Sequence, residues 1–204
     1  RHADVLGLSV AAGNVGLRHT VANALKLVDT IGAATPVFAG CATPLVRAAE
    51  DAAFVHGLDG FGDTAYVPSA RRAEREHAAQ AILRLSHEHA GQLVFVAMAP
   101  LTNLALALRL DPGLPQRVAR LVIMGGAVTG RGNTSASTEF NVGFDPEAAH
   151  IVFSAWEPGT YWGQCAEFCG LQHAMMKFRI IALDATDWAN WVQARKQPAP
   201  MPSP

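Results

Sequence analysis

Leu93-Val-Phe-Val-Ala97, followed by Leu101–Leu110 and Ala119–Met124, is the stretch that decides the expected fold. The first and last of these segments are apolar runs, which predict buried strands. The middle segment carries apolar residues at helical intervals and ends at Asp111-Pro112, where proline stops a helix. Strand, helix and strand in this order are typical of a parallel α/β sheet.

The same alternation continues on both sides of this stretch. Further strands are predicted over Asp4–Ala11 and Pro36–Ala39, and further helices over Thr20–Ile31, Ala70–His89 and Pro146–Trp156. The apolar run Asp4–Ala11 is expected to be buried on both faces. The expected fold is therefore α/β, a partial doubly wound parallel sheet with flanking helices. Such sheets place their sites at the carboxyl ends of the strands, here Gly13-Asn14, Ala99–Thr102 and Gly125-Gly126.

Composition narrows the classes of function. The chain has 204 residues, 50% of them hydrophobic and 16% charged, which suits one globular domain with a small appendage. A net charge of −1 gives no reason to expect a nucleic-acid or membrane-surface partner. Proline and polar residues interrupt the apolar stretch Leu93–Leu108, so no membrane span is predicted. The chain starts at Arg1 rather than Met and reaches strand material by Asp4, which indicates truncation at the N-terminus.

A series of short strings occurs in order along the first three quarters of the chain. They are Val10–Asn14, Pro44–Arg47, His56-Gly57, Pro100–Asn103, Met124–Gly126, Glu139–Asn141 and Asp145–Ala149. In this order and spacing they resemble the inosine-uridine nucleoside hydrolase family over residues 1–156. The resemblance implies N-ribosyl hydrolysis of purine or pyrimidine nucleosides, through an oxocarbenium-like transition state. It also implies a calcium ion that holds the attacking water and the ribose diol, because calcium prefers oxygen ligands.

The resemblance also assigns roles to particular residues. Ribose-lining residues would be Met124, Asn133, Glu139 and Asn141, with Asn14 on the ribose or supporting the metal-binding loop. His56 would lie near the base, and the backbone carbonyl of Thr102 would be a calcium ligand. Each residue also has a plainer interpretation: Asn14 as a turn residue, Met124 as core, His56 as a helix end, and the Glu and Asn side chains as solvated.

Two elements of the family pattern have no counterpart in this sequence. The family opens with an Asp-x-Asp-x-Gly-x-Asp-Asp motif that supplies most calcium carboxylates and the general base, and it carries a downstream His-Asp pair. We therefore expect family membership without hydrolase activity, and the family's usual cytoplasmic location.

The sequence changes character after Trp156. Cys165, Cys169, His173 and Met176 form a dense set of soft ligands, which favours copper over hard cations. The string from Pro158 through these residues to about Val192 resembles the copper A loop of cytochrome c oxidase subunit II. The resemblance implies two bridging cysteines, terminal His173 and Met176 ligands, and a backbone carbonyl ligand from Glu167, with cytochrome c as the electron donor.

Other interpretations of this loop stay open: a zinc site, an adventitious metal loop, or a Cys165–Cys169 disulfide. Met175 is the rival thioether, and the upstream histidine of the family has no match, so the copper site is expected to be incomplete. The ancestry would place the loop on the periplasmic side or in the intermembrane space. Cys41 is expected to be an inert buried thiol.

The expected organisation is a nucleoside-hydrolase-like segment over 1–156, a cupredoxin-derived segment over 157–196 and a Pro-rich tail over 197–204. The middle segment is predicted to hold a strand over Lys177–Leu183 and a helix over Asp184–Arg195. Three functions remain in competition: a hydrolase-like protein, an oxidase subunit II fragment with an electron-transfer loop, and a non-functional fusion of the two.

Overall fold

The computed structural model describes residues 3–127, 132–154, 159–164 and 177–196. It divides into two compact units, Arg1–Ala155 and Trp156–Pro204. In the described ranges no helix is long and apolar enough to cross a membrane.

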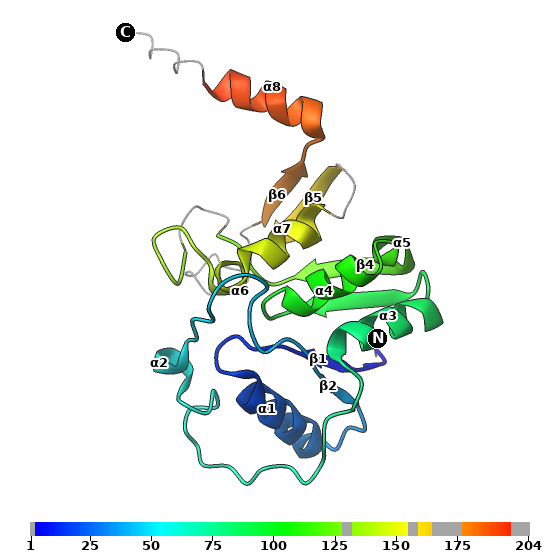
Figure 1. Cartoon of the computed structure of the whole chain (residues 1–204), viewed down its shortest axis with the longest axis vertical. Coiled ribbons are helices and arrows are strands. Elements are labelled where there is room, and N and C mark those ends of the chain that lie inside the picture. Colours follow the sequence, from blue (N-terminus) through cyan, green and yellow to red (C-terminus); the bar gives the residue numbers. More distant parts are fainter. Residues whose placement is uncertain (1–2, 128–131, 155–158, 165–176, 197–204) are drawn as a thin grey trace. The chain divides into compact units, whose positions relative to one another are not determined.

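The first parallel pair of strands joins β1 (Leu8–Val10) to β2 (Val37–Ala39). Helix α1 (Leu17–Thr30) connects them and packs Leu25 and Val28 against Val37. Figure 1 shows this pair between α1 and α3 (Ala78–Glu88), and both helices contact both strands. The alternation of strand and helix therefore produces the expected parallel pairing.

The second parallel pair joins β3 (Leu93–Ala97) to β4 (Val118–Ile123). Helices α4 (Thr102–Leu110) and α5 (Leu114–Arg117) connect them. Six residues of α4 are buried, and α4 packs on α3 and on α7 (Pro146–Ser154). The strands and helix predicted from this stretch are confirmed to within one residue at each end.

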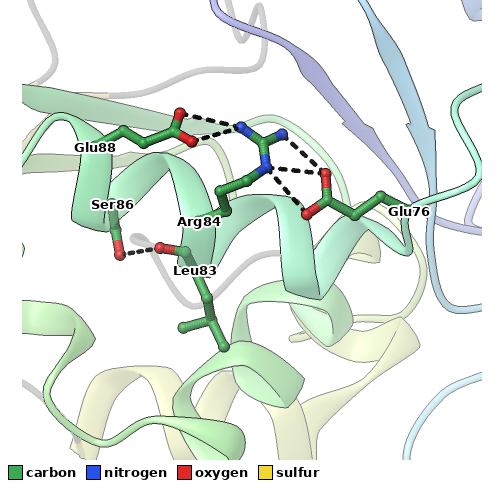
Figure 2. A network of polar contacts seen from close by, with 5 residues as sticks. All are labelled: Glu76, Leu83, Arg84, Ser86 and Glu88. Atoms are coloured by element: carbon green, nitrogen blue, oxygen red, sulfur yellow. Dashed lines mark hydrogen bonds and ion pairs between the residues drawn. The ribbon is translucent and has the colours of Figure 1, made fainter.

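Helix α3 begins later than the predicted start at Ala70. The backbone N–H of Glu74 donates to the Val37 carbonyl at 2.8 Å, so the preceding segment follows β2 in extended form. His77 then caps the helix by accepting from the Ala79 N–H. On the outer face of α3, Arg84 bonds the carboxylates of Glu76 and Glu88 (Figure 2).

These contacts place Arg84 between two carboxylates while Phe38 lies beneath it. The guanidinium carbon lies 5.9 Å from the centre of the Phe38 ring. Hydrogen bonds, first to Glu76 and then to Glu88, raise the pKa of Arg84 above its ordinary value. Because this group is exposed, each ion pair stabilises the helix by well under about 1 kcal/mol.

Three short helices were not predicted. They are α5, given above, α2 (Ala53–His56) and α6 (Phe140–Phe144). Helix α7 does begin at the predicted Pro146, after Asp145.

The predicted partial parallel sheet is found as separate pairs of strands. Within the described residues β1 pairs only with β2, and β3 pairs only with β4, so the first unit holds two separate two-stranded sheets. The prediction that the first strand is buried on both faces is wrong, because Leu8–Val10 is only half-buried. In the part of the chain that the structure describes, β1 and β3 both line one cavity, and each has a paired neighbour on one edge only.

The second unit contains an antiparallel hairpin of β5 (Gly159–Gln164) and β6 (Lys177–Ala182), followed by α8 (Ala185–Arg195). The predicted strand and helix are confirmed, and β5 was not predicted. The predicted copper ligands Cys165, Glu167, Cys169, His173 and Met176 lie outside the described residues. The hairpin by itself does not show a cupredoxin fold.

Candidate functional site

The loops that follow β1 and β3 meet at one edge of the first unit. A Cβ placed on Gly13 would lie 3.0 Å from Cδ of Pro100, so these loops are in contact. Next to them a cavity of about 940 Å³ is lined by two of the three predicted asparagines, Asn14 and Asn141, together with Met98 and Pro100, but not by Asn133. The carboxyl ends of the parallel strands thus bring together residues far apart in the sequence, as expected.

Glu139 is the N-cap of α6. Its Oε1 accepts from the Asn141 N–H at 2.9 Å, and its Oε2 accepts from Val142 and from Gly126 at 3.1 and 2.9 Å. Capping explains why a short helix begins here, since the carboxylate satisfies two of its free donors. The third bond ties α6 to the loop after β4. Oε1 takes one donor only and retains acceptor capacity.

Asn141 is buried, at 8% exposure, and its amide joins two loops. Nδ2 donates to the Met124 carbonyl at 3.1 Å and lies 3.5 Å from the Met98 carbonyl and from the Met124 sulfur. Met124 is itself 38% exposed, so it is not a core residue. The ends of β3 and β4 therefore fix the orientation of this amide.

Asn133 is exposed and acts on the chain that leads into α6. Its Oδ1 accepts from the Phe140 N–H at 2.8 Å, and its own N–H donates to the Thr138 carbonyl at 3.0 Å. Asn133, Glu139, Asn141 and Met124 thus form one connected group around the start of α6.

Thr102, at the first position of α4, is buried and bonded to Asp145, whose role the sequence did not show. Its Oγ1 donates to Oδ2 of Asp145 at 2.7 Å. The same carboxylate accepts from the N–H groups of Leu45 and Ala148, both at 3.0 Å. Asp145 is fully buried, so it holds α4, α7 and the loop after β2 together.

Asn103 is the second residue whose role was missed. Its Nδ2 donates to Ser9 Oγ at 3.0 Å and to the Val10 carbonyl at 3.1 Å, while its Oδ1 accepts from the Cys41 N–H at 2.7 Å. A Cβ on Gly40 would collide with this amide. The glycine was the available sequence signal, but its partner is 63 positions away, and only the fold identifies it.

Asn14 and His56 lie on neighbouring segments. The Asn14 carbonyl accepts from the Ala52 N–H at 2.9 Å, which anchors the start of α2. His56 is the last residue of that helix, and Gly57 follows with φ of 82°. His56 does not line the cavity that Asn14 and Asn141 share. Its predicted role near the base stays a prediction.

The described residues do not fit a calcium ion by themselves. Among them no three His, Cys, Asp or Glu side chains lie close enough to hold a metal. The buried carboxylate beside Thr102, the proposed calcium ligand, belongs to Asp145, and it already accepts three hydrogen bonds. The Cys41 thiol is only partly buried. Desolvation raises the pKa of this thiol, and the negative charge of Asp145 raises it further. That thiol stays protonated at neutral pH and is a poor metal ligand.

Comparison with known proteins shows the family. The model of the inosine-uridine preferring nucleoside hydrolases matches residues 1–201. The chain belongs to this family. The match extends across the segment predicted to derive from an oxidase subunit, and nothing in the comparisons shows a copper A segment.

Relatives of known activity and structure agree with this membership. The pyrimidine-specific ribonucleoside hydrolase RihB of Escherichia coli O1:K1 is 36% identical over 160 residues, which are 78% of this chain and 51% of the relative. A purine-preferring ribonucleoside hydrolase from Gardnerella vaginalis superposes with a TM-score of 0.73 at 35% identity, covering 76% of this chain and 51% of that one. An inosine-guanosine nucleoside hydrolase gives 0.70 at 37% identity, covering 75% and 49%.

The chain therefore spans about half the length of the curated relatives it matches. The nucleoside-hydrolase-like α/β fold of the first unit is shared with solved members of the family.

Proposed function

We propose that this nucleoside hydrolase family chain carries the ribose-binding part of a ribonucleoside hydrolase site. The observation that carries the proposal is the position of Asn141. Its amide is fixed by the loops after β3 and β4 and lines the same cavity as Asn14. Two amides on converging loops suit a sugar diol, because each amide offers both donors and an acceptor.

Glu139 adds the acceptor that a diol requires. Its Oε2 is engaged by two backbone N–H groups, whereas Oε1 accepts one and can accept a hydroxyl proton as well. A cap that also binds substrate would couple the start of α6 to ribose. Met124 would contribute an apolar contact beside the amides, and Asn133 would keep the loop that supports Glu139 in place.

We expect this chain to bind ribonucleosides without hydrolysing them faster than background. Hydrolysis needs an activated water and stabilisation of positive charge on the sugar. The described residues supply no carboxylate cluster for a calcium ion that would activate the water. The Thr102 carbonyl remains a proposed ligand that would act only together with such carboxylates.

The test separates binding from turnover. Inosine and uridine are titrated onto the chain by NMR or calorimetry, with and without calcium, and ribose release is measured in parallel. Asn141→Leu should weaken binding at least tenfold. Asn23→Leu is the matched control, because Asn23 is equally buried but bonds Asp59 away from the cavity. Binding that survives Asn141→Leu would contradict the ribose site, and turnover well above background would contradict the expected inactivity.

A second candidate function concerns the soft ligands Cys165, Cys169, His173 and Met176, with the Glu167 carbonyl. The observation in its favour is that β5 and β6 pair up to Gln164 and Lys177, so the residues that flank these ligands in the sequence lie side by side. We propose copper binding with electron transfer from a cytochrome c-like donor. Copper reconstitution followed by EPR tests this: a mixed-valence binuclear signal, lost in Cys165→Ser but kept in Cys41→Ser, is the expected result. A signal of isolated copper, or none, would contradict it.

A further inference from the structure

We propose that helix α8 is a self-association surface, through which two copies of this chain pair with their α8 helices antiparallel. The occupant of the surface is a second copy of the same chain, and the contact is made by two tryptophans and two charged helix ends from each copy. The proposal concerns residues 184–196 of the second unit alone. It is therefore independent of the nucleoside binding proposed for the first unit.

Helix α8 has no buried side of its own. None of its 11 residues is buried, and its large side chains Trp188 and Trp191 are 56% and 45% exposed. A helix shorter than about 12–15 residues is marginal in water, and in proteins it is stabilised mostly by the packing of an apolar face. A helix of this length with two exposed tryptophans therefore gains stability from a partner that covers them.

The two tryptophans lie on one face of α8, together with an arginine. The rings of Trp188 and Trp191 stack with their centres 5.3 Å apart and an angle of 16° between their planes. The guanidinium carbon of Arg195 lies 5.2 Å from the centre of the Trp191 ring. Side chains three and four residues apart are neighbours on a helix surface, so these contacts form a ladder along α8. Because the ladder already orders these side chains, less of their freedom is lost on binding.

The charged residues of this segment are separated by sign along the helix. Asp184 and Asp187 lie at its start, and Arg195 and Lys196 lie at its end, whereas residues 188–194 carry no charge. An antiparallel pair places the acidic start of each helix against the basic end of the other. A parallel pair would place like charges together at both ends. Charge complementarity therefore favours a second copy of α8 as the partner and selects the antiparallel direction.

The spacing of the ladder gives the register of the pair. From Asp184, the residues Trp188, Trp191 and Arg195 follow at intervals of four, three and four, which is the spacing of the seam between two packed helices. In one antiparallel register, Trp188 of each copy lies against Trp191 of the other. The same register brings Asp184 of each copy opposite Arg195 of the other. Apolar contacts at the centre and ion pairs at both ends thus form together around one two-fold axis.

The size of the surface indicates a transient pair. A fully buried aromatic side chain covers about 150–250 Å², and Trp188 and Trp191 have about half of their surface left to bury. The tryptophans and charged ends of two copies therefore bury less than the roughly 1,200–2,000 Å² of a stable interface. We expect a dissociation constant on the order of 100 µM, so that the chain is a monomer when dilute and a dimer when concentrated.

Other classes of partner fit this surface less well. Residues 184–196 carry two acidic and two basic side chains, so the segment has no net charge. A helix that lies on a membrane usually has a polar face rich in Lys and Arg, and a nucleic-acid site needs a basic patch. Helix α8 has neither, whereas a second α8 supplies both an aromatic surface and the complementary charges.

Sedimentation equilibrium of the full chain tests the pairing. The molar mass is measured from about 10 µM to about 1 mM at low salt, with a reductant that excludes intermolecular disulfides, and it should rise from monomer to dimer. Trp188→Ala should weaken association at least about tenfold, because aromatic side chains dominate such contacts. Phe54→Ala is the control and should have no effect, since Phe54 is an exposed aromatic residue of the first unit. A monomer throughout, or association unchanged by Trp188→Ala, would overturn the proposal.

Two charge variants test the antiparallel direction while they keep both tryptophans and the Asp184 cap. Asp187→Lys and Arg195→Glu each remove the attraction between helix start and helix end, so each should associate at least about threefold more weakly than the unmodified chain. In an equimolar mixture, one end of the mixed pair regains the original acidic and basic residues. The mixture should therefore associate more tightly than either variant alone. Either variant associating as tightly as the unmodified chain, or a mixture no tighter than its components, would overturn the antiparallel pairing.

Discussion

Asp145 and Asp184 occupy the same local position in the two units of the molecule. Each precedes a helix and accepts a hydrogen bond from the N–H three residues on, at 3.0 Å from Ala148 and 2.9 Å from Asp187. Asp145 is fully buried and accepts two further bonds, from the Thr102 hydroxyl and the Leu45 N–H. Asp184 is exposed and has only its local role. An aspartate that caps a helix is thus expected to stabilise the first unit much more than the second.

The helices that follow differ in the same way. Helix α7 buries Ala148, Ala149 and Val152 and packs on α4. Helix α8 buries none of its residues, and Trp188 and Trp191 stack on its surface with ring centres 5.3 Å apart. Tertiary packing stabilises α7, whereas α8 depends mainly on its own propensity and cap.

Asp145→Ala should have the largest effect. It leaves the Thr102 hydroxyl and the Leu45 and Ala148 N–H groups without their acceptor in the interior, which destabilises the first unit by about 3 kcal/mol or more. Urea unfolding followed by hydrogen exchange in α4 and α7 measures this.

Tryptophan fluorescence provides the internal control, because all four tryptophans, at 156, 162, 188 and 191, belong to the second unit. Their emission should not change in Asp145→Ala under native conditions. If Asp145→Ala lowers the free energy of unfolding by less than about 1 kcal/mol, burial adds nothing to the stabilisation by this cap. Asp145 and Asp184 would then be equivalent.

Asn103→Ala should be next in size, at about 2 kcal/mol. It removes the amide that bonds Ser9, Val10 and the Cys41 N–H, and it leaves the partly buried Cys41 N–H without its acceptor. Hydrogen exchange should accelerate in β1 and β2 before it does in β4. Uniform acceleration throughout the first unit would show that Asn103 is not a local tie between these strands.

Asp184→Ala should cost about 1 kcal/mol or less, as for an exposed N-cap. The expected result is fraying at the start of α8, seen as faster exchange at Asp187 and Trp188, with unchanged unfolding of the first unit. Asp184→Asn, which keeps the acceptor, is the control and should behave like the unmodified chain. A change in first-unit stability would refute the independence of the two caps.

Asp111 at the end of α4 should give the smallest effect, which is present at neutral pH and fades in acid. The Gly113 N–H first, and then Arg117 at 2.6 Å, hold the pKa of this carboxyl below its ordinary value. A lowered folded-state pKa stabilises the fold above the unfolded pKa of about 4, and that stabilisation is lost as pH falls through the folded value. Asp111→Asn should therefore flatten the stability profile below about pH 5. If the stability of Asp111→Asn still falls as steeply with pH as that of the unmodified chain, other carboxylates cause the pH dependence.

Local patterns in the sequence predicted most of the first unit. The apolar runs of β3 and β4, the helical spacing of α4 and the Asp145-Pro146 start of α7 are all found, because each signal is complete within a few residues. The expected start of α3 was wrong, since the residues before it form a bridge beside β2 that only the fold creates.

The sequence likewise predicted part of the candidate site. The rule for strand ends pointed to Gly13-Asn14 and Ala99–Thr102, and residues of both loops do line one cavity. It could not show that Glu139 ties α6 to Gly126, or that Asn103 and Asp145 tie distant segments, because those bonds link residues 13 to 100 positions apart. The assigned roles in ribose and metal binding remain predictions.

The sequence by itself determined where strands and helices form, which strands follow one another in parallel, and which family the chain resembles. These depend on periodicity, caps and ordered short strings. Only the tertiary structure decided that the strands form two separate pairs with a cavity between them, and that one aspartate cap is buried while another is exposed. The physical reason is that unpaired edges and the burial of a polar group depend on neighbours from distant segments, which no local pattern specifies.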